Sequence, residues 1–142
     1  MRPWALFIFM LALSTPAAAA GTEINADRAR INYMLNCQGC HLPRGEGVGD
    51  IPQMENFVGN FLKVSGGRAF LVRVPGSANA ALDDAALAEL LNWMLLEISA
   101  DQLPKDFQPY TAAEVGQYRA SPLSDVNAVR LPLIQKIAQL PE

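Results

Sequence analysis

The sequence predicts an all-α fold. Two stretches, residues 26–36 and 84–99, space their apolar side chains as the buried face of a helix does. The segments between them are rich in glycine and proline, which favours irregular loops. The 142 residues are enough for one domain with a modest core.

The first element is a predicted secretory signal peptide over residues 1–20. Arg2 precedes an apolar run over residues 4–13, and a proline and a series of alanines follow. This order is typical of an exported protein. The alternative is an uncleaved anchor, but the run is shorter than the roughly 20 residues that span a membrane. We expect cleavage before Gly21, a periplasmic location in a Gram-negative bacterium and no stable membrane insertion of the mature chain.

The charge of the mature chain argues against a nucleic-acid partner. Loss of Arg2 leaves ten basic and fourteen acidic side chains. Phosphate binding needs a concentrated basic surface, whereas here the two signs are interspersed along the chain. We therefore expect an ordinary solvated surface and no nucleic-acid binding.

The first helix of the mature chain is predicted over residues 26–36. Asn25 can cap its start, and Asp27 suits the positive end of the helix dipole. Three residues recur at helical spacing and share one face: Ala29, Tyr33 and Cys37.

This helix leads into the motif Cys37-Gln38-Gly39-Cys40-His41, a C-x-x-C-H pattern. Two thiols three positions apart on one helical turn can reach the two vinyl groups of one porphyrin and form thioethers. The histidine that follows is thereby brought under the iron. We predict one covalent haem c, bound through Cys37 and Cys40, with its iron held by His41.

Other uses of the two cysteines fit less well. A C-x-x-C redox pair often opens a helix after a strand, but the segment before Cys37 is predicted to be helical. A zinc site needs about four ligands, and the chain has no further cysteine or histidine. Because His41 is the only histidine, a second histidine ligand from this chain is excluded.

The middle of the chain is less regular. Residues 42–52 contain three glycines and are predicted to form a loop that can fold closely over a ring. In residues 54–74 the apolar side chains have helical spacing as far as a break at Gly66-Gly67, and residues 70–74 suit either a short helix or an extended piece. Pro75-Gly76 is predicted to be a turn.

The clearest helix is predicted from about Asp84 to Ser99, with Asp83 as its cap. It has an apolar stripe at a period of 3.6 residues, which must pack against the first helix and the haem. The stripe contains Leu87, Leu90, Leu91, Met94, Leu95 and Ile98, with Trp93 beside it.

Residues 100–142 are predicted to be a helical C-terminal extension. Thr111 and Glu114 form a capping-box pattern that opens a helix to about Arg119. Ser124 can cap a final helix that is interrupted or kinked near Pro132. The extension could be an additional wall of the haem domain or a docking element for a redox partner.

Residues 25–99 resemble a class I cytochrome c: a first helix that runs into C-x-x-C-H, a glycine-rich loop and a closing helix. The resemblance implies a cytochrome c fold over residues 21–99, with its first and last helices packed around one haem. It also implies that Tyr33 packs on Trp93 and that the carbonyl of Pro52 accepts a hydrogen bond from the histidine ring. Such a contact fixes the ring tautomer and raises ligand basicity.

The sequence departs from this family at the sixth iron ligand. The family takes a methionine from the loop before the last helix, but residues 64–82 contain none. Of the methionines in the mature chain, Met34 is predicted to be core. Met54 lies in an irregular segment and is the proposed ligand, although the family places that region near the histidine side. Met94, a donor other than methionine, and an open iron are the alternatives.

The function predicted from these features is electron transfer rather than enzymatic catalysis. The only histidine is used by the haem, and no phosphate-binding glycine loop precedes a helix. We predict a periplasmic carrier that passes single electrons between a dehydrogenase and a downstream acceptor such as an oxidase. The alternative is a haem enzyme or small-ligand sensor with an open sixth position.

Overall fold

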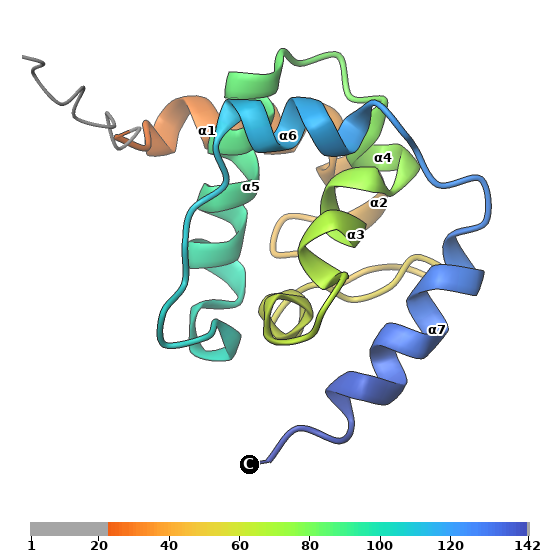
Figure 1. The fold of residues 1–142 in the computed structure, drawn as a ribbon. Helices are drawn as coiled ribbons and strands as arrows, with labels where there is room; N and C mark the ends of the chain where they lie inside the picture. The colour runs from red at the N-terminus through yellow and green to blue at the C-terminus, as the bar shows by residue number, and fades with distance from the viewer. Residues whose placement is uncertain (1–22, 142) are drawn as a thin grey trace, which may run out of the picture.

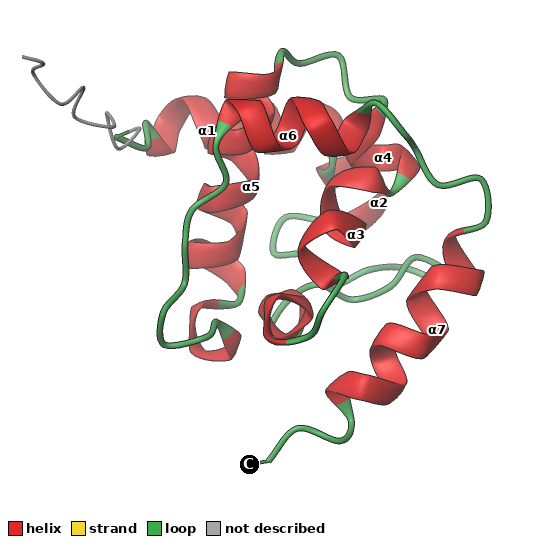
Figure 2. Cartoon of the chain, in the orientation of Figure 1, coloured by secondary structure: helices red, strands yellow, loops and turns green. Residues whose placement is uncertain are grey.

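The computed structural model describes residues 23–141, so the predicted signal peptide lies outside the described part of the chain. Over these residues the fold is built from helices and loops without strands, as predicted (Figures 1 and 2). The elements in chain order are α1 (Ala26–Asn36), α2 (Gln38–His41), η1 (Val58–Lys63), α3 (Gly67–Arg73), α4 (Pro75–Ala78), α5 (Asp84–Ile98), η2 (Ala100–Gln102), α6 (Ala112–Arg119) and α7 (Val126–Ile137).

Helices α1 and α5 form the central packing pair, and both begin at the predicted caps. The side chain of Asn25 accepts a hydrogen bond from the backbone N–H of Arg28, and that of Asp83 accepts one from Ala86. Where the helices meet, the rings of Tyr33 and Trp93 lie 5.7 Å apart between centroids. The packing of Tyr33 on Trp93 is therefore as expected.

Glu89 holds the start of α1 against α5. Its carboxylate is almost fully buried and accepts two hydrogen bonds of 2.7 Å from the guanidinium of Arg28. It also accepts a 2.9 Å bond from the backbone N–H of Asn25. The hydrogen bonds from Arg28 are the main cause of the lowered pKa of Glu89, because they stabilise its charged form.

The structure differs from two sequence predictions in the segment that follows η1. Helix α3 begins at Gly67, three residues before the predicted piece, because Gly66 adopts a left-handed conformation with φ of 89° and turns the chain directly into it. Pro75-Gly76 is the first turn of α4 rather than a free turn. Proline suits a first helical position, since its fixed φ is helical and no N–H is needed there.

The extension packs on the helices that precede it: α6 contacts α3 and α5, and α7 contacts η1 and α3 (Figure 1). Thr111 caps α6 as predicted, but the predicted capping box is only half formed. The carboxylate of Glu114 binds the guanidinium of Arg68 instead of returning to the cap. An ion pair to a neighbouring helix thus replaces a local contact.

Helix α7 differs from prediction at two positions. Its cap is Asp125 rather than Ser124, and the Asp125 side chain accepts a 3.0 Å hydrogen bond from the backbone of Ala128. The helix is not interrupted at Pro132 and runs on to Ile137. Pro132 and Ala128 are both exposed, so the Ala128 carbonyl that loses its helical partner can face water.

A buried amide joins the extension to α5. The side chain of Asn92 donates a 3.0 Å hydrogen bond to the carbonyl of Tyr110 and accepts a 2.7 Å bond from its N–H. The hydroxyl of Tyr110 donates to the carbonyl of Arg68, whose guanidinium lies 4.1 Å from the centre of the tyrosine ring. Burial raises the pKa of Tyr110, so the hydroxyl keeps its proton.

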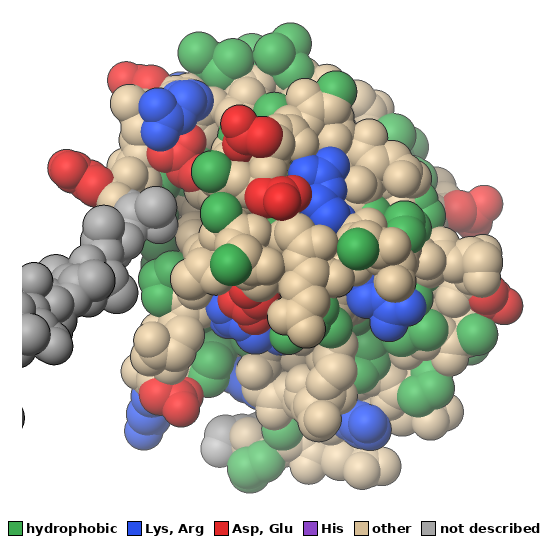
Figure 3. All heavy atoms as spheres, turned by 45° about the horizontal axis from the view of Figure 1, so that its top comes forward, with side chains coloured by type: hydrophobic (Ala, Val, Ile, Leu, Met, Phe, Trp, Pro, Cys, Tyr) green, Lys and Arg blue, Asp and Glu red, His purple; other side chains and the backbone are tan. Residues whose placement is uncertain are grey.

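Acidic and basic side chains are mixed over the face drawn in Figure 3. The helices of residues 23–141 include none with the length and apolarity required of a membrane span.

Replacement of Asn92 by alanine tests this link to the extension. Both backbone groups of Tyr110 would be left buried without a partner, so we expect a loss of about 1–3 kcal/mol in the free energy of unfolding. Urea denaturation measures the loss. Asn127→Ala, at an exposed position of α7, is the control, and equal stability of the two variants would contradict the role of Asn92.

Candidate functional site

The C-x-x-C-H residues lie in the wall of an apolar cavity of about 380 Å³. Helix α5 supplies one side of it, and η1, α3 and the start of α4 supply others. Two residues of α7 complete the lining. The apolar side chains in the wall include Ile51, Val58, Phe61, Phe70, Leu71, Val74, Leu87, Leu90, Leu91 and Val126.

The motif forms a single helical turn after α1. The backbone N–H groups of Cys40 and His41 donate hydrogen bonds of 3.2 and 3.0 Å to the carbonyl of Cys37. Cys37 is half-buried, Cys40 is exposed, and the two are free thiols. Burial raises the pKa of Cys37 to about 11, so this thiol is neutral at neutral pH.

The ring of His41 is oriented by Pro52. Nδ1 of His41 lies 3.2 Å from the carbonyl oxygen of Pro52, which can only accept a hydrogen bond. The proton therefore belongs on Nδ1, and Nε2 keeps its lone pair. Burial lowers the pKa of His41 and outweighs the opposing effect of the carbonyl, so the neutral ring, which is the form that binds a metal, is favoured.

Glycines of the loop after His41 bring Pro52 and Met54 back to the motif. The N–H of Gly47 donates to the carbonyl of His41, and the carbonyl of Gly45 accepts a 2.7 Å bond from the N–H of Met54. Gly47 has a φ of 74°, and a β-carbon there would overlap the backbone of Ile51 and Pro52. This position requires glycine for both its φ and its close approach.

Tyr33 holds the other end of the same loop. Its side chain is 1% exposed, and its hydroxyl donates a 2.7 Å hydrogen bond to the carbonyl of Leu42, the residue after His41. Burial is the main cause that raises the pKa of Tyr33 to about 12, so the donor proton is retained. The predicted core aromatic thus also positions the chain beside the motif.

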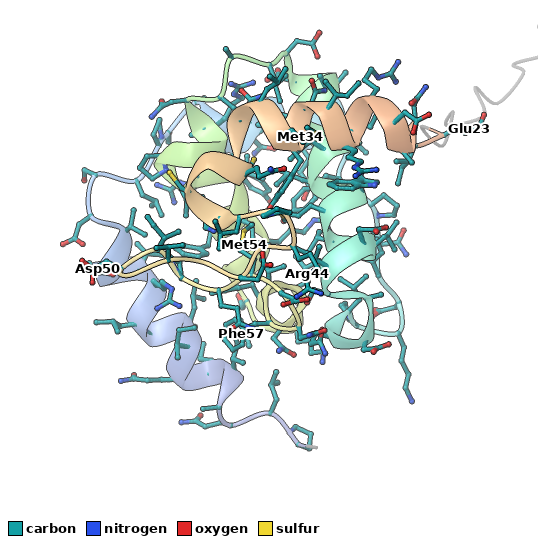
Figure 4. All side chains as sticks on the ribbon, turned by 180° about the vertical axis from the view of Figure 1, so that it is seen from behind. Glu23, Met34, Arg44, Asp50, Met54 and Phe57 are labelled. Atoms are coloured by element: carbon teal, nitrogen blue, oxygen red, sulfur yellow. The ribbon has the colours of Figure 1, made fainter. Side chains whose placement is uncertain are left out.

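Two of the three methionines in residues 23–141 reach the cavity. Met54 is half-buried and Met94 is 4% exposed, and both line the wall. Met34 lies on α1 with half of its surface exposed, so the prediction that it is a core residue is wrong (Figure 4). The face of α1 that packs on the core is the one that carries Ala29 and Tyr33, and Met34 lies outside that face.

Sequence reasoning missed the contribution of α7, which places Val126 and Arg130 in the cavity wall. Their spacing of four residues indicates a shared helical face, but nothing local shows what that face contacts.

Within residues 23–141, no three His, Cys, Asp or Glu side chains are grouped closely enough to hold a metal ion.

No protein-family model matches the chain. It is similar to cytochrome c-552 of Thermus thermophilus, with 31% identity over 118 residues that cover 70% of this chain and 88% of the relative. A second cytochrome c-552, from a named strain of the same species, matches with the same identity over 70% of this chain and 78% of its own. The chain belongs to the class I c-type cytochromes. Membership of this family makes it an electron-transfer protein that carries covalent haem, in agreement with its all-α fold.

Replacement of Gly47 by alanine tests how this cytochrome orients its histidine. The added methyl group would push the Pro52 carbonyl away from His41, so we expect a loss of about 1–3 kcal/mol beyond the cost of the left-handed backbone. Gly49→Ala is the matched control, because Gly49 also has a positive φ but has open space around it. Urea unfolding gives the stabilities, and faster exchange of the His41 Nδ1 proton in Gly47→Ala alone is the expected NMR signature. Identical behaviour of both variants would contradict the role of Gly47.

Proposed function

We propose that this chain is a monohaem carrier of single electrons in the periplasm, exported by the signal peptide over residues 1–20. Cys37 and Cys40 form the thioether bonds, His41 binds the iron through Nε2, and the Pro52 carbonyl holds the imidazole. The observation that supports the proposal most directly is that both thiols and the imidazole line one apolar cavity.

The residues of the cavity fit a covalent haem. Apolar side chains suit the faces of a porphyrin, and the free Cys37 and Cys40 lie on one helical turn beside a histidine with Nε2 available. A bound haem would supply one-electron chemistry between ferric and ferrous iron. The exposure of Cys40 marks the edge of the cavity at which a partner could approach.

We propose Met54 as the sixth ligand, with Met94 as its competitor. Met54 follows Pro52 in a segment without helical structure, where the backbone places fewer limits on the side chain than α5 places on Met94. A thioether opposite histidine raises the reduction potential and suits electron transfer. A periplasmic dehydrogenase as donor and an oxidase or similar protein as acceptor complete the proposal.

A second function is favoured by one observation on the cavity. The segment before α5, which supplies the methionine in the family, contributes Val74, Pro75, Ser77 and Ala80, and none of these is a strong iron ligand. An open sixth position would allow small ligands to bind. The chain would then be a haem enzyme or sensor.

Covalent haem attachment is tested with the full chain expressed in a host competent in cytochrome maturation. We expect the purified protein to start at Gly21, to gain the mass of one haem and to show a low-spin spectrum. The double variant Cys37→Ser/Cys40→Ser should lose the haem under denaturing conditions, because no thioether holds it. A colourless wild-type protein without added mass would contradict the proposal.

Replacement of Met54 by leucine tests the sixth ligand. A methionine bound to ferric iron gives a charge-transfer band near the red edge of the spectrum, and we expect Met54→Leu to abolish it. Met94→Leu is the matched control and should keep the band.

The opposite pattern in the two variants would assign the ligand to Met94. A wild-type spectrum without the band, together with binding of carbon monoxide or cyanide within seconds, would instead support the open iron and the second function.

A further inference from the structure

Arg130 is a half-buried cation in the wall of an otherwise apolar cavity. It lies on α7, in the extension beyond the cytochrome pattern. The helix is held in place by Leu133, which is 5% exposed and belongs to the hydrophobic core. Val126 lies one turn before Arg130 and also lines the cavity. One face of α7 therefore meets the core, and Arg130 belongs to that face.

Arg130 is unusual among the arginines of the described chain because it combines burial with the lack of a partner. Five of the seven arginines in residues 23–141 donate hydrogen bonds to oxygen atoms of the protein. The remaining two, Arg30 and Arg130, have no such bond and no ion pair within these residues. Arg30 is exposed to water, whereas Arg130 is partly removed from it.

The charged groups of η1 and α3, the elements against which α7 packs, are already engaged. Lys63 of η1 donates to the side chain of Asn60, and Arg73 of α3 donates to the carbonyl of Ser121. Arg68 of α3 is paired with Glu114, and Asp125 caps α7 itself. Among these residues, Arg130 is therefore the cation that remains free to bind an anion in the cavity.

A half-buried guanidinium without a partner is costly, and its fork of N–H groups matches a carboxylate. Haem brings two carboxylates, its propionates, into the cavity that receives it. We propose that Arg130 binds a haem propionate, so that the C-terminal extension is part of the haem site. The proposal rests on the haem attachment proposed above.

The test uses the haem-loaded mature protein, with carbon-13 in the propionate carboxylates introduced through labelled aminolevulinate. NMR titration then gives the pKa of each propionate. We expect one propionate of the wild type to titrate about one to three units below the other. In Arg130→Gln this difference should disappear, and Arg130→Lys should keep part of it. Arg30→Gln removes the same charge from an exposed position and should leave both values unchanged.

Several results would overturn the proposal. Equal propionate pKa values in the wild type would do so without reference to any variant, and so would a difference that persists in Arg130→Gln. If the propionate pKa values stay unchanged in Arg130→Gln and in Arg30→Gln while Arg130→Gln alone weakens azide binding, Arg130 binds an exogenous anion on the iron instead. Mass spectrometry separates this from failure of the proposed function, because a wild type without haem would overturn both proposals.

Discussion

The contact between Nδ1 of His41 and the carbonyl of Pro52 is the constraint on which the site depends. It connects the two ends of the glycine-rich loop, and it leaves Nε2 as the nitrogen available to a metal. Tyr33 holds the start of that loop through Leu42, and Gly47 allows the return of the chain to Pro52. The orientation of one ring is thus determined by residues from α1, the loop and the core together.

The packing of α1 on α5 connects the site to the rest of the protein. Tyr33 contributes to the helix packing and to the position of the loop, because its ring lies against Trp93 while its hydroxyl donates to the carbonyl of Leu42. At the other end of α1, the carboxylate of Glu89 fixes Arg28 and the backbone of Asn25. The helix that leads into the motif is therefore held at both ends, which gives the thiols and the imidazole a defined position in the cavity wall.

The extension belongs to the same core in the described structure. Asn92 and Tyr110 join it to α5, Arg68 and Glu114 join α3 to α6, and α7 reaches the cavity. This arrangement favours the wall over the docking element among the two roles considered from the sequence. It also places Arg130 in the wall of an apolar cavity. A nearby cation and an apolar environment would both disfavour the ferric form of a bound iron, because that form carries one more positive charge than the ferrous form.

Local features were sufficient for the motif and for the main helices. Asn25 and Asp83 cap their own helices, and the apolar period of α5 is visible without a partner, so both helices could be predicted nearly to the residue. The C-x-x-C-H spacing is equally local, because it is contained in one helical turn. By contrast, Glu114 binds Arg68, a residue distant in sequence. Helix α7 continues through Pro132 because that side of the helix faces water, and which side faces water is decided by how the opposite side packs on the rest of the chain. The place of Arg130 in the cavity wall was decided in the same way, by tertiary packing that no local pattern encodes.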